Sequence, residues 1–261
     1  MLHALRRQII PSLMLTAVVA VALGLAYPIL MTGLGQGLFS AKANGSFITD
    51  AKGNVVASSL IGQNFLDAKG NPDPKYFQPR PSAAGAGYDP TASGASNLGP
   101  GDPRLVGFIP GFNTVGLDGA ASPTNVFATK DDPYCVPTDD TGAAVTSPAA
   151  GQKYAENPDG SYVCDPSTVP ERAIAYRQLN GLAATATVPV DAVTGSASGL
   201  DPAISVANAD LQAPRVAKAR NLPLDTVLGL VKSNTHGPQL GFIGETTVNV
   251  VTLNLALDSR G

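Results

Sequence analysis

The longest apolar stretch of the chain lies close to its N-terminus. Residues 13–35 carry no charged side chain, and Arg6 and Arg7 lie shortly before them. A helix of about 20 apolar residues crosses the hydrocarbon core of a bilayer. We therefore predict a transmembrane helix over residues 13–35 and a short cytoplasmic N-terminus over residues 1–12. Basic residues stay on the cytoplasmic side of a membrane, so the rest of the chain is expected on the other side.

A cleaved signal peptide is the alternative interpretation of the same stretch. Arg6 and Arg7 would form its basic region, and AKA at residues 41–43 resembles a cleavage site after Ala43. The apolar region of a signal peptide has about 7–15 residues, which is shorter than the run found here. The length therefore favours a single-pass anchor. Both interpretations place the residues after Ser40 outside the cytoplasm.

Shorter apolar patterns after the membrane exit predict several strands. Residues 46–49 and 55–61 are apolar runs on either side of the turn cluster DAKGN, which indicates two strands. A further short strand is expected at residues 188–190. The segment TTVNVVTLNLALD, residues 246–258, has the clearest strand pattern. A bulge near Val251 would bring its two apolar faces into register.

Two helices are predicted before that last segment. Residues 204–221 read as helical on either side of Pro214, which suits the first position of a new helical turn. Pro223 starts the next helix, whose apolar stripe has the spacing i, i+3, i+4, i+7 and comprises Leu224, Val227, Leu228 and Val231. Early strands, two or more helices and a final strand together predict a small extracytoplasmic α+β domain.

The middle of the chain has little periodicity. From Asn71 to about Thr187 no regular pattern extends far, and we interpret residues 101–169 as a long, loop-rich insertion. The domain would then have a first part over 40–100 and a remainder over 170–261.

The two cysteines lie within this insertion, Cys135 at its middle and Cys164 near its end. Cys135 and Cys164 stand in proline-rich surroundings, DPYCVP and SYVCDP. In an oxidising compartment we expect them to form a disulfide. A metal site is the alternative, but two cysteines and a single histidine after the span are a poor set of zinc ligands.

Composition and motifs exclude several function classes. The net charge is −3, and no basic stripe interleaved with aromatics is present, which argues against nucleic-acid binding. Neither a phosphate-binding P-loop motif nor an H-E-x-x-H motif occurs. His236 is the one histidine after the span, so a nucleophile–histidine site would have to use it. We interpret His236 as a surface residue.

Two polar segments are candidates for contacts with a partner. Prolines hold the backbone of YFQPRPSA, residues 76–83, so Phe77 and Arg80 could be presented at low entropic cost. PRVAKARN, residues 214–221, places Arg215 and Lys218 one helical turn apart. The alternatives are a rigid loop packed on its own domain for the first segment and a solvated helix face for the second.

Six blocks of the sequence carry a family resemblance. They are, in order, SLIGQNF, YFQPRPSA, YDPTASGASNLGP, SGLDPAIS, PRVAKARNL and VNVVTLNLALD. Together with the N-terminal anchor, they resemble the C subunit of the bacterial Kdp-type potassium-transporting ATPase. The cysteine-bearing segment over residues 101–169 departs from the family pattern, in which this stretch is commonly shorter and helical.

The resemblance implies a non-catalytic accessory subunit of a high-affinity ATP-driven potassium uptake complex. The implied partners are a potassium-selecting polytopic subunit and a P-type subunit that hydrolyses ATP, besides the membrane lipid around the anchor. The subunit would be needed for assembly and would raise the ATP affinity of the P-type subunit, with ATP bound through the complex and no tightly bound cofactor. A glutamine before the PRVAKAR block is linked to this role in the family, and by position it is Gln212.

Topology and the ATP-related role are in tension, because the basic N-terminus places Gln212 outside the cell, whereas ATP is inside. We therefore expect the outer domain to cap the extracellular side of the potassium-selecting subunit and to act on ATP affinity indirectly. One alternative is an exported binding or hydrolytic domain that acts alone after cleavage behind Ala43. Another is a structural cell-surface protein.

Overall fold

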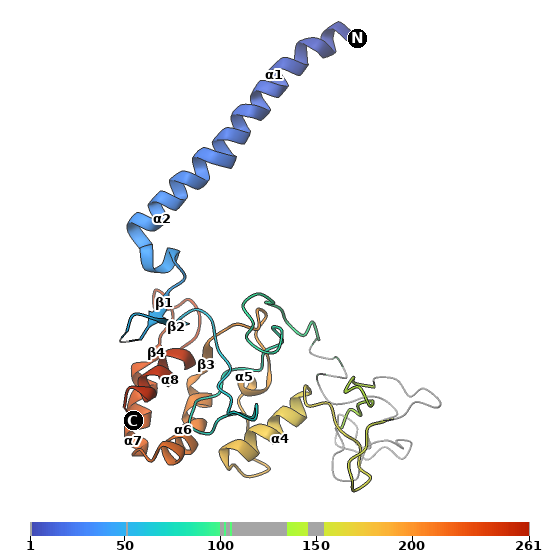
Figure 1. The fold of residues 1–261 in the computed structure, drawn as a ribbon, viewed down its shortest axis with the longest axis vertical. Helices are drawn as coiled ribbons and strands as arrows, with labels where there is room; N and C mark the ends of the chain where they lie inside the picture. Colours follow the sequence, from blue (N-terminus) through green and yellow to red (C-terminus); the bar gives the residue numbers. More distant parts are fainter. Residues whose placement is uncertain are drawn as a thin grey trace. The chain divides into compact units, whose positions relative to one another are not determined.

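A computed structural model describes residues 2–50, 52–99, 102, 105, 135–145 and 154–260, with side chains from Arg7 onward. The chain divides into two compact units, Met1–Leu60 and Ile61–Gly261. The ribbon in Figure 1 follows both units. Most of the insertion predicted over 101–169 lies outside the described residues, so its bounds stay a prediction.

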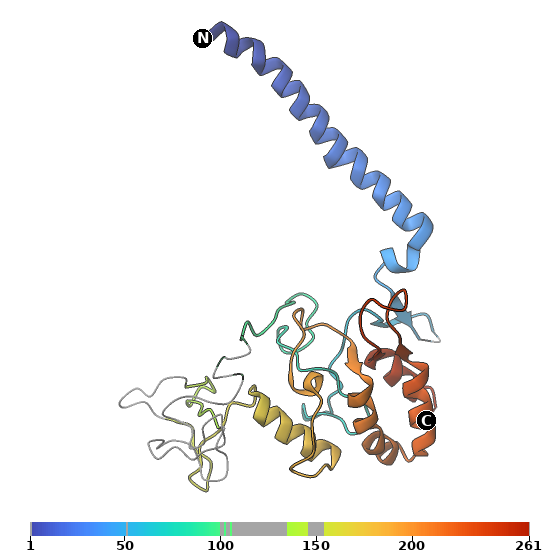
Figure 2. The ribbon, with the colours of Figure 1, turned by 180° about the vertical axis from the view of Figure 1, so that it is seen from behind.

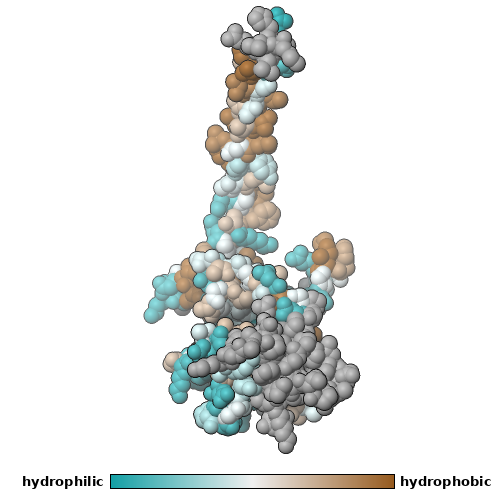
Figure 3. Space-filling model, turned by 90° about the vertical axis from the view of Figure 1, so that its right-hand side faces the viewer, coloured by the Kyte–Doolittle hydropathy of each residue, from teal (hydrophilic) through white to brown (hydrophobic). Residues whose placement is uncertain are grey.

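The first unit begins with a long helical run. It comprises α1 (Leu2–Val21), the π-helical turn η1 (Ala22–Ala26) and α2 (Tyr27–Ala43). Residues Arg7–Ala43 are apolar enough to cross a membrane, and they include the predicted span. Figure 3 shows apolar side chains along much of this helix. Pro28 explains the wide turn, because a proline ring clashes with the carbonyl four residues earlier and the π-turn relieves that clash.

An antiparallel hairpin follows the helix in the same unit. Its strands are β1 (Phe47–Thr49) and β2 (Val55–Ser58), with Phe47 opposite Ser58, which confirms the two strands predicted from the sequence. The Asp50 carboxylate accepts hydrogen bonds from the backbone N–H groups of Lys52 and Asn54, at 2.8 and 2.9 Å. The same five letters at residues 67–71 form the same turn, because they offer the same acceptor.

The second unit combines five helices with a three-stranded sheet among its described residues. The sheet is antiparallel in the order β3-β5-β4, with Ile204 and Thr235 both opposite Val248. The elements are α4 (Val169–Asn180), α5 (Val190–Val193), β3 (Ala203–Ser205), α6 (Val206–Arg220), α7 (Leu224–Ser233), β4 (Thr235–His236), β5 (Thr247–Asn249) and α8 (Val250–Asp258). The predicted α+β class is confirmed.

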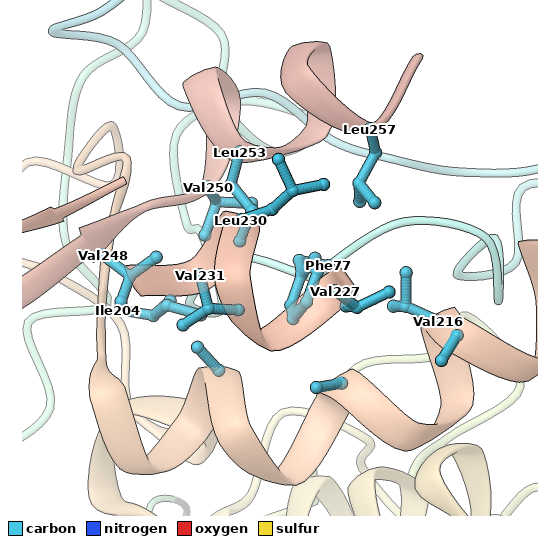
Figure 4. Packing of buried hydrophobic residues seen from close by; sticks show 13 residues of the cluster. Phe77, Ile204, Val216, Val227, Leu230, Val231, Val248, Val250, Leu253 and Leu257 are labelled. Atoms are coloured by element: carbon cyan, nitrogen blue, oxygen red, sulfur yellow. The ribbon is translucent and has the colours of Figure 1, made fainter. Parts of the chain in front are cut away.

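One hydrophobic core lies between the last three helices and the sheet. Figures 1 and 2 show α6, α7 and α8 gathered together from opposite sides. Figure 4 shows Phe77, which comes from an irregular segment, in the middle of this cluster. The other fully buried large side chains of the core are Ile204, Val216, Val227, Val248, Val250, Leu253 and Leu257.

Two strand predictions were wrong. Only residues 247–249 of the final segment form a strand, and α8 follows immediately. The side chain of Asn249 accepts a hydrogen bond from the N–H of Thr252 and thereby caps the helix. Val250, Leu253 and Leu257 then fall on one helical face, so no bulge is needed. The strand expected at 188–190 is absent, since Pro189 stands at the N-cap position of the single helical turn α5, which begins at Val190.

Helix α4 was not predicted, and α6 runs through its proline. Thr168 accepts a hydrogen bond from the N–H of Glu171 at the start of α4, and Gly181 ends it in the left-handed conformation. This is a capping signal that the sequence contained. Pro214 lies inside α6 rather than at the start of a new turn. The apolar stripe of α7 is confirmed as a core face through Val227 and Val231, although Leu224 remains 42% exposed.

Candidate functional site

The candidate site is built around residues 76–80, which we call the YFQPR segment. Phe77 is fully buried, and its backbone N–H and C=O both bond to the side chain of Asn254 on α8. Both distances are 2.9 Å. Asn254 is itself fully buried. Its amide satisfies the backbone N–H and C=O of Phe77, as the backbone of a neighbouring strand would. Phe77 is therefore a core anchor of its own domain and not an exposed docking residue.

Gln212 on α6 makes the same kind of contact with the next residue. Its Oε1 accepts from the N–H of Gln78 at 2.7 Å, and its Nε2 donates to the carbonyl of Gln78 at 3.0 Å. Successive residues of an extended segment direct their backbone groups to opposite sides. Two buried amides from two helices thus hold consecutive residues of the YFQPR segment.

The remaining hydrogen-bonding positions of Gln212 are also filled. Its Nε2 donates to Oδ1 of Asn208 at 2.9 Å, and its Oε1 accepts from Nη2 of Arg215 at 2.8 Å. A glutamine amide offers two donors and two acceptor positions. Gln212 is 1% exposed and uses all four within its own domain. The residue that the family resemblance links to nucleotide binding is therefore occupied by protein groups.

Arg215 fastens the start of the YFQPR segment. Its guanidinium donates to the carbonyls of Pro74 and Tyr76, at 2.7 and 3.0 Å, and to Oδ1 of Asn180 at 2.9 Å. Burial lowers the pKa of Arg215 to about 10, so the group is still charged at neutral pH. The charged guanidinium therefore makes its contacts inside the domain. The docking role that the sequence suggested for Arg215 would need the same group to face a partner.

Asn208 extends the network to two further elements. Its Oδ1 accepts from the hydroxyl of Tyr176 on α4 at 2.9 Å, and its Nδ2 donates to Asp191 on α5 at 3.0 Å. Asp191 also accepts from the N–H of Ser205, which precedes α6. Burial raises the pKa of the Tyr176 hydroxyl and keeps it a donor. The network joins α4, α5, α6 and the YFQPR segment.

Arg80 and Lys218, the other two docking candidates, differ in exposure. Arg80 donates to the carbonyls of Thr194 and Gly195, at 3.2 and 3.0 Å, and its Nη1 lies 3.8 Å from Asp201. Lys218 is exposed on α6. Of the four candidates, Lys218 is the one whose charge faces solvent, and its docking role stays a prediction.

The stiff segment SGASNLGP is described over residues 93–99, and it contacts Ser198 and Gly199 of the same unit. Gly94 donates its N–H to the carbonyl of Ser198 at 2.9 Å. A side chain at Gly199, whose φ is +68°, would come within 2.6 Å of the Gly94 carbonyl. Only glycine fits this close approach without a shift of the backbone. The segment therefore shapes the domain through its backbone.

A groove of about 400 Å³ lies beside the YFQPR segment. Gln78 and Arg80 line it on one side, and Arg172 and Tyr176 of α4 line it on the other. Burial lowers the pKa of Arg172, whose Nη1 donates to the carbonyl of Val193 at 3.0 Å.

The cysteines and the histidine after the span lie outside this network. Cys135 and Cys164 are joined by a disulfide, as expected from their setting. His236 is exposed on β4. Among the described residues, no group of three or more histidine, cysteine, aspartate or glutamate side chains is placed to hold a metal ion.

The sequence analysis missed Asn254, Asn208 and Tyr176. Asn254 stands in an apolar run, VTLNLALD, that was read as a strand. Read with helical spacing, Asn254 lies four residues after Val250 and three before Leu257, on the buried face of α8. A polar residue on such a face is a signal for a buried hydrogen-bond partner.

Most of the chain is similar to known proteins. The family model described as KdpC, K+-transporting ATPase, c chain, matches residues 9–111 and 142–259. The chain is 40% identical to the potassium-transporting ATPase KdpC subunit of Mycobacterium tuberculosis, over 97% of this chain and 99% of that protein. It is 41% identical to the subunit of the same name from Caulobacter vibrioides, over 96% of this chain and 92% of that protein.

Proposed function

The chain belongs to the KdpC family, and we propose that it is an accessory subunit of an ATP-driven, high-affinity potassium uptake complex. The observation that carries the proposal is the family match, which includes the anchor and most of the second unit. Its partners in this proposal are the potassium-selecting polytopic subunit and the P-type subunit that hydrolyses ATP. In this proposal, those partners hydrolyse ATP and select the potassium ion.

The candidate site supports a structural role. Gln212, Asn254 and Arg215 all form hydrogen bonds to the backbone of residues 74–78. Buried polar groups that are fully satisfied make a segment rigid. Such a site suits a domain that presents a fixed surface to partner subunits.

An effect on ATP affinity would be indirect. Gln212 could contact a nucleotide only by giving up bonds to Gln78, Asn208 or Arg215. We propose instead that Gln212 maintains the shape of the domain, and that this shape is coupled to the nucleotide site through the assembled complex. Lys218, which is exposed on α6, is our candidate for a contact with a partner.

We place the second unit on the extracytoplasmic side. Arg6 and Arg7 lie at the N-terminal end of the candidate span Arg7–Ala43, whereas Lys42 is the one basic residue at its other end. The excess of positive charge at the N-terminal end favours a cytoplasmic N-terminus. The disulfide Cys135–Cys164 supports this orientation, because disulfides persist in oxidising compartments.

Co-purification tests the proposal. The chain is tagged at its C-terminus, membranes of potassium-starved cells are extracted in mild detergent, and the eluate is assayed for potassium-stimulated ATP hydrolysis. We expect activity to elute with a large P-type subunit and a polytopic partner. A soluble, inactive chain that begins at Asn44 would overturn the proposal and favour the exported stand-alone domain.

A matched pair of variants tests the indirect role of Gln212. Gln212→Leu removes the buried amide, and Gln178→Leu changes an exposed glutamine on α4. We expect Gln212→Leu to raise the KM for ATP together with a lower thermal stability of the subunit, while Gln178→Leu changes neither. A raised KM with unchanged stability would instead indicate a direct nucleotide contact.

A further inference from the structure

The loop between β4 and β5 carries an exposed apolar tip. Leu240 is 83% exposed, Phe242 is 78% exposed and Ile243 is 51% exposed. Residues 237–244 contain no charged side chain, and Glu245 comes after them. Large apolar side chains scattered singly over a surface are ordinary, but three within four residues form a patch.

The backbone of this tip satisfies much of its own hydrogen bonding. Gln239 and Ile243 exchange two backbone hydrogen bonds, at 2.8 and 2.9 Å. Gly241 donates its N–H to Pro238 at 3.1 Å, and Phe242 donates to Gln239 at 3.3 Å. A peptide segment can leave water at low cost only when its N–H groups have partners. The tip meets this condition at four of its N–H groups.

The tip also keeps a leucine in an unfavourable conformation. Leu240 has a φ of +54°, and Gly241 follows with a φ of +81°. A left-handed conformation costs a non-glycine residue about 1–2 kcal/mol. Glycine at position 240 would avoid this cost, yet the chain places a large apolar side chain there. Strain of this kind indicates that the side chain has a use outside the fold.

We propose that the tip formed by Leu240, Phe242 and Ile243 inserts into the interfacial layer of the lipid bilayer. The same chain carries a helix that is apolar enough to span a membrane, so we take a bilayer as the apolar medium nearest to hand. Within the first unit, the N–H of Ser59 bonds to the carbonyl of Ser46 at 3.1 Å and closes the hairpin that follows this helix. This proposal goes beyond the subunit role and does not depend on which partner the domain contacts.

The chemistry of the tip fits lipid better than a protein surface. Protein interfaces surround their apolar anchors with a polar rim that forms directed hydrogen bonds. Here the one side chain with an amide between residues 237 and 244 is Gln239. Aliphatic and aromatic side chains on a loop with a largely self-bonded backbone need only a non-directional apolar medium. A bilayer interface provides that medium to a depth of about 5–10 Å.

The absence of tryptophan from the chain makes a direct test possible. Phe242→Trp places a single fluorophore at the tip, and Val190→Trp places one on α5, where Val190 is similarly exposed at 73%. Each full-length variant is reconstituted into vesicles of phosphatidylcholine and phosphatidylglycerol, with or without bromine on the acyl chains. We expect brominated lipid to reduce the emission of Phe242→Trp about two-fold and to leave Val190→Trp nearly unchanged.

Two outcomes would overturn the proposal. Iodide in the aqueous phase could quench both variants equally while brominated lipid quenches neither, which would place the tip in water. Alternatively, a benzophenone amino acid at position 242 in native membranes could cross-link to a polypeptide and not to lipid, which would assign the tip to a protein partner. A lipid adduct together with quenching by brominated lipid would support insertion.

Discussion

Gln212 and Asn254 each pair with both backbone groups of one residue, and the two residues that they hold, Gln78 and Phe77, are consecutive. Gln212 lies on α6 and Asn254 lies on α8, so the YFQPR segment is held between two helices. This arrangement explains why two prolines and a polar stretch occur in the middle of the domain. The prolines stiffen a segment whose backbone is bonded to side chains instead of a neighbouring strand.

The first prediction concerns Gln212. Gln212→Leu leaves the partly buried N–H and C=O of Gln78 without these partners, and each such group costs about 1–3 kcal/mol when it is buried. We expect the free energy of unfolding to fall by about 3 kcal/mol, measured by urea titration with circular dichroism in detergent. Gln178→Leu, on the exposed side of α4, should change it by less than about 0.5 kcal/mol. Equal effects of the two variants would contradict the role of the amide.

The second prediction concerns the geometry of Arg215. A lysine keeps the charge but cannot reach Asn180, Pro74 and Tyr76 with one planar fork. Arg215→Lys should lower the free energy of unfolding by about 2 kcal/mol, whereas Lys218→Arg on the solvent side should be nearly neutral. A stability of Arg215→Lys equal to that of the parent chain would show that charge alone is sufficient.

The same residue predicts how stability depends on pH. Burial lowers the pKa of Arg215 to about 10, below the ordinary value for arginine. Below that pH the group is charged in both folded and unfolded chains, so its contribution is constant near neutrality. Above about pH 10 the unfolded chain binds more protons than the folded one, and stability from this group rises with pH. The difference in unfolding free energy between the parent chain and Arg215→Gln, which has no titrating group at this position, should therefore be flat between about pH 6 and 8.

The third prediction concerns the disulfide. Cys135 and Cys164 are 29 residues apart, and closing a loop of that size stabilises the folded chain by about 3.5 kcal/mol in the chain-entropy model. We expect the double variant Cys135→Ser, Cys164→Ser to be cleaved faster by protease between these two positions, as read by mass spectrometry. Cleavage within α6 and α7 should keep its original rate, since no side chain of this bridge belongs to the main core. Faster cleavage both between the two cysteine positions and within α6 and α7 would show that these regions unfold as one unit.

The fourth prediction concerns orientation. Alkaline phosphatase is active only after export, so its fusion behind the C-terminus should be active in cells, and a fusion of green fluorescent protein at the same place should be dark. A variant that moves the positive charge carries Arg6→Asn, Arg7→Asn and two lysines added after Ala43. In this variant we expect lower phosphatase activity and some fluorescence. A fluorescent, phosphatase-inactive parent chain would overturn the extracytoplasmic placement.

The fifth prediction concerns strain at the loop tip. Leu240→Gly should raise the free energy of unfolding by about 1 kcal/mol in detergent, because glycine adopts a φ of +54° without steric cost. Leu66→Gly is the control, since Leu66 is also partly exposed, at 47%, but has no positive φ. That control should be neutral or destabilising. A destabilised Leu240→Gly would mean that the leucine packs within the fold rather than serving a contact outside it.

Features that depend on neighbouring residues could be read from the sequence. The helix that is apolar enough to span a membrane follows from one long uncharged run, and the hairpin follows from two short apolar runs around the DAKGN turn. The helical character of residues 206–220 and 224–233 follows from local propensity and apolar spacing. The six ordered blocks were sufficient to recognise the family, which the comparisons then showed.

The tertiary structure alone decided what the polar residues do. Phe77 and Asn254 are 177 positions apart, and Gln78 and Gln212 are 134 apart, so no local pattern indicates that they are partners. Phe77, Arg80 and Arg215 have the composition of a docking surface, yet each is used inside the domain. Residues 250–258 fit a strand pattern when a bulge is assumed and a helix pattern without one, and the cap at Asn249 together with burial of one helical face selects the helix. Local sequence sets which conformations are available to a segment, whereas the choice among them depends on buried partners that only the complete fold brings together.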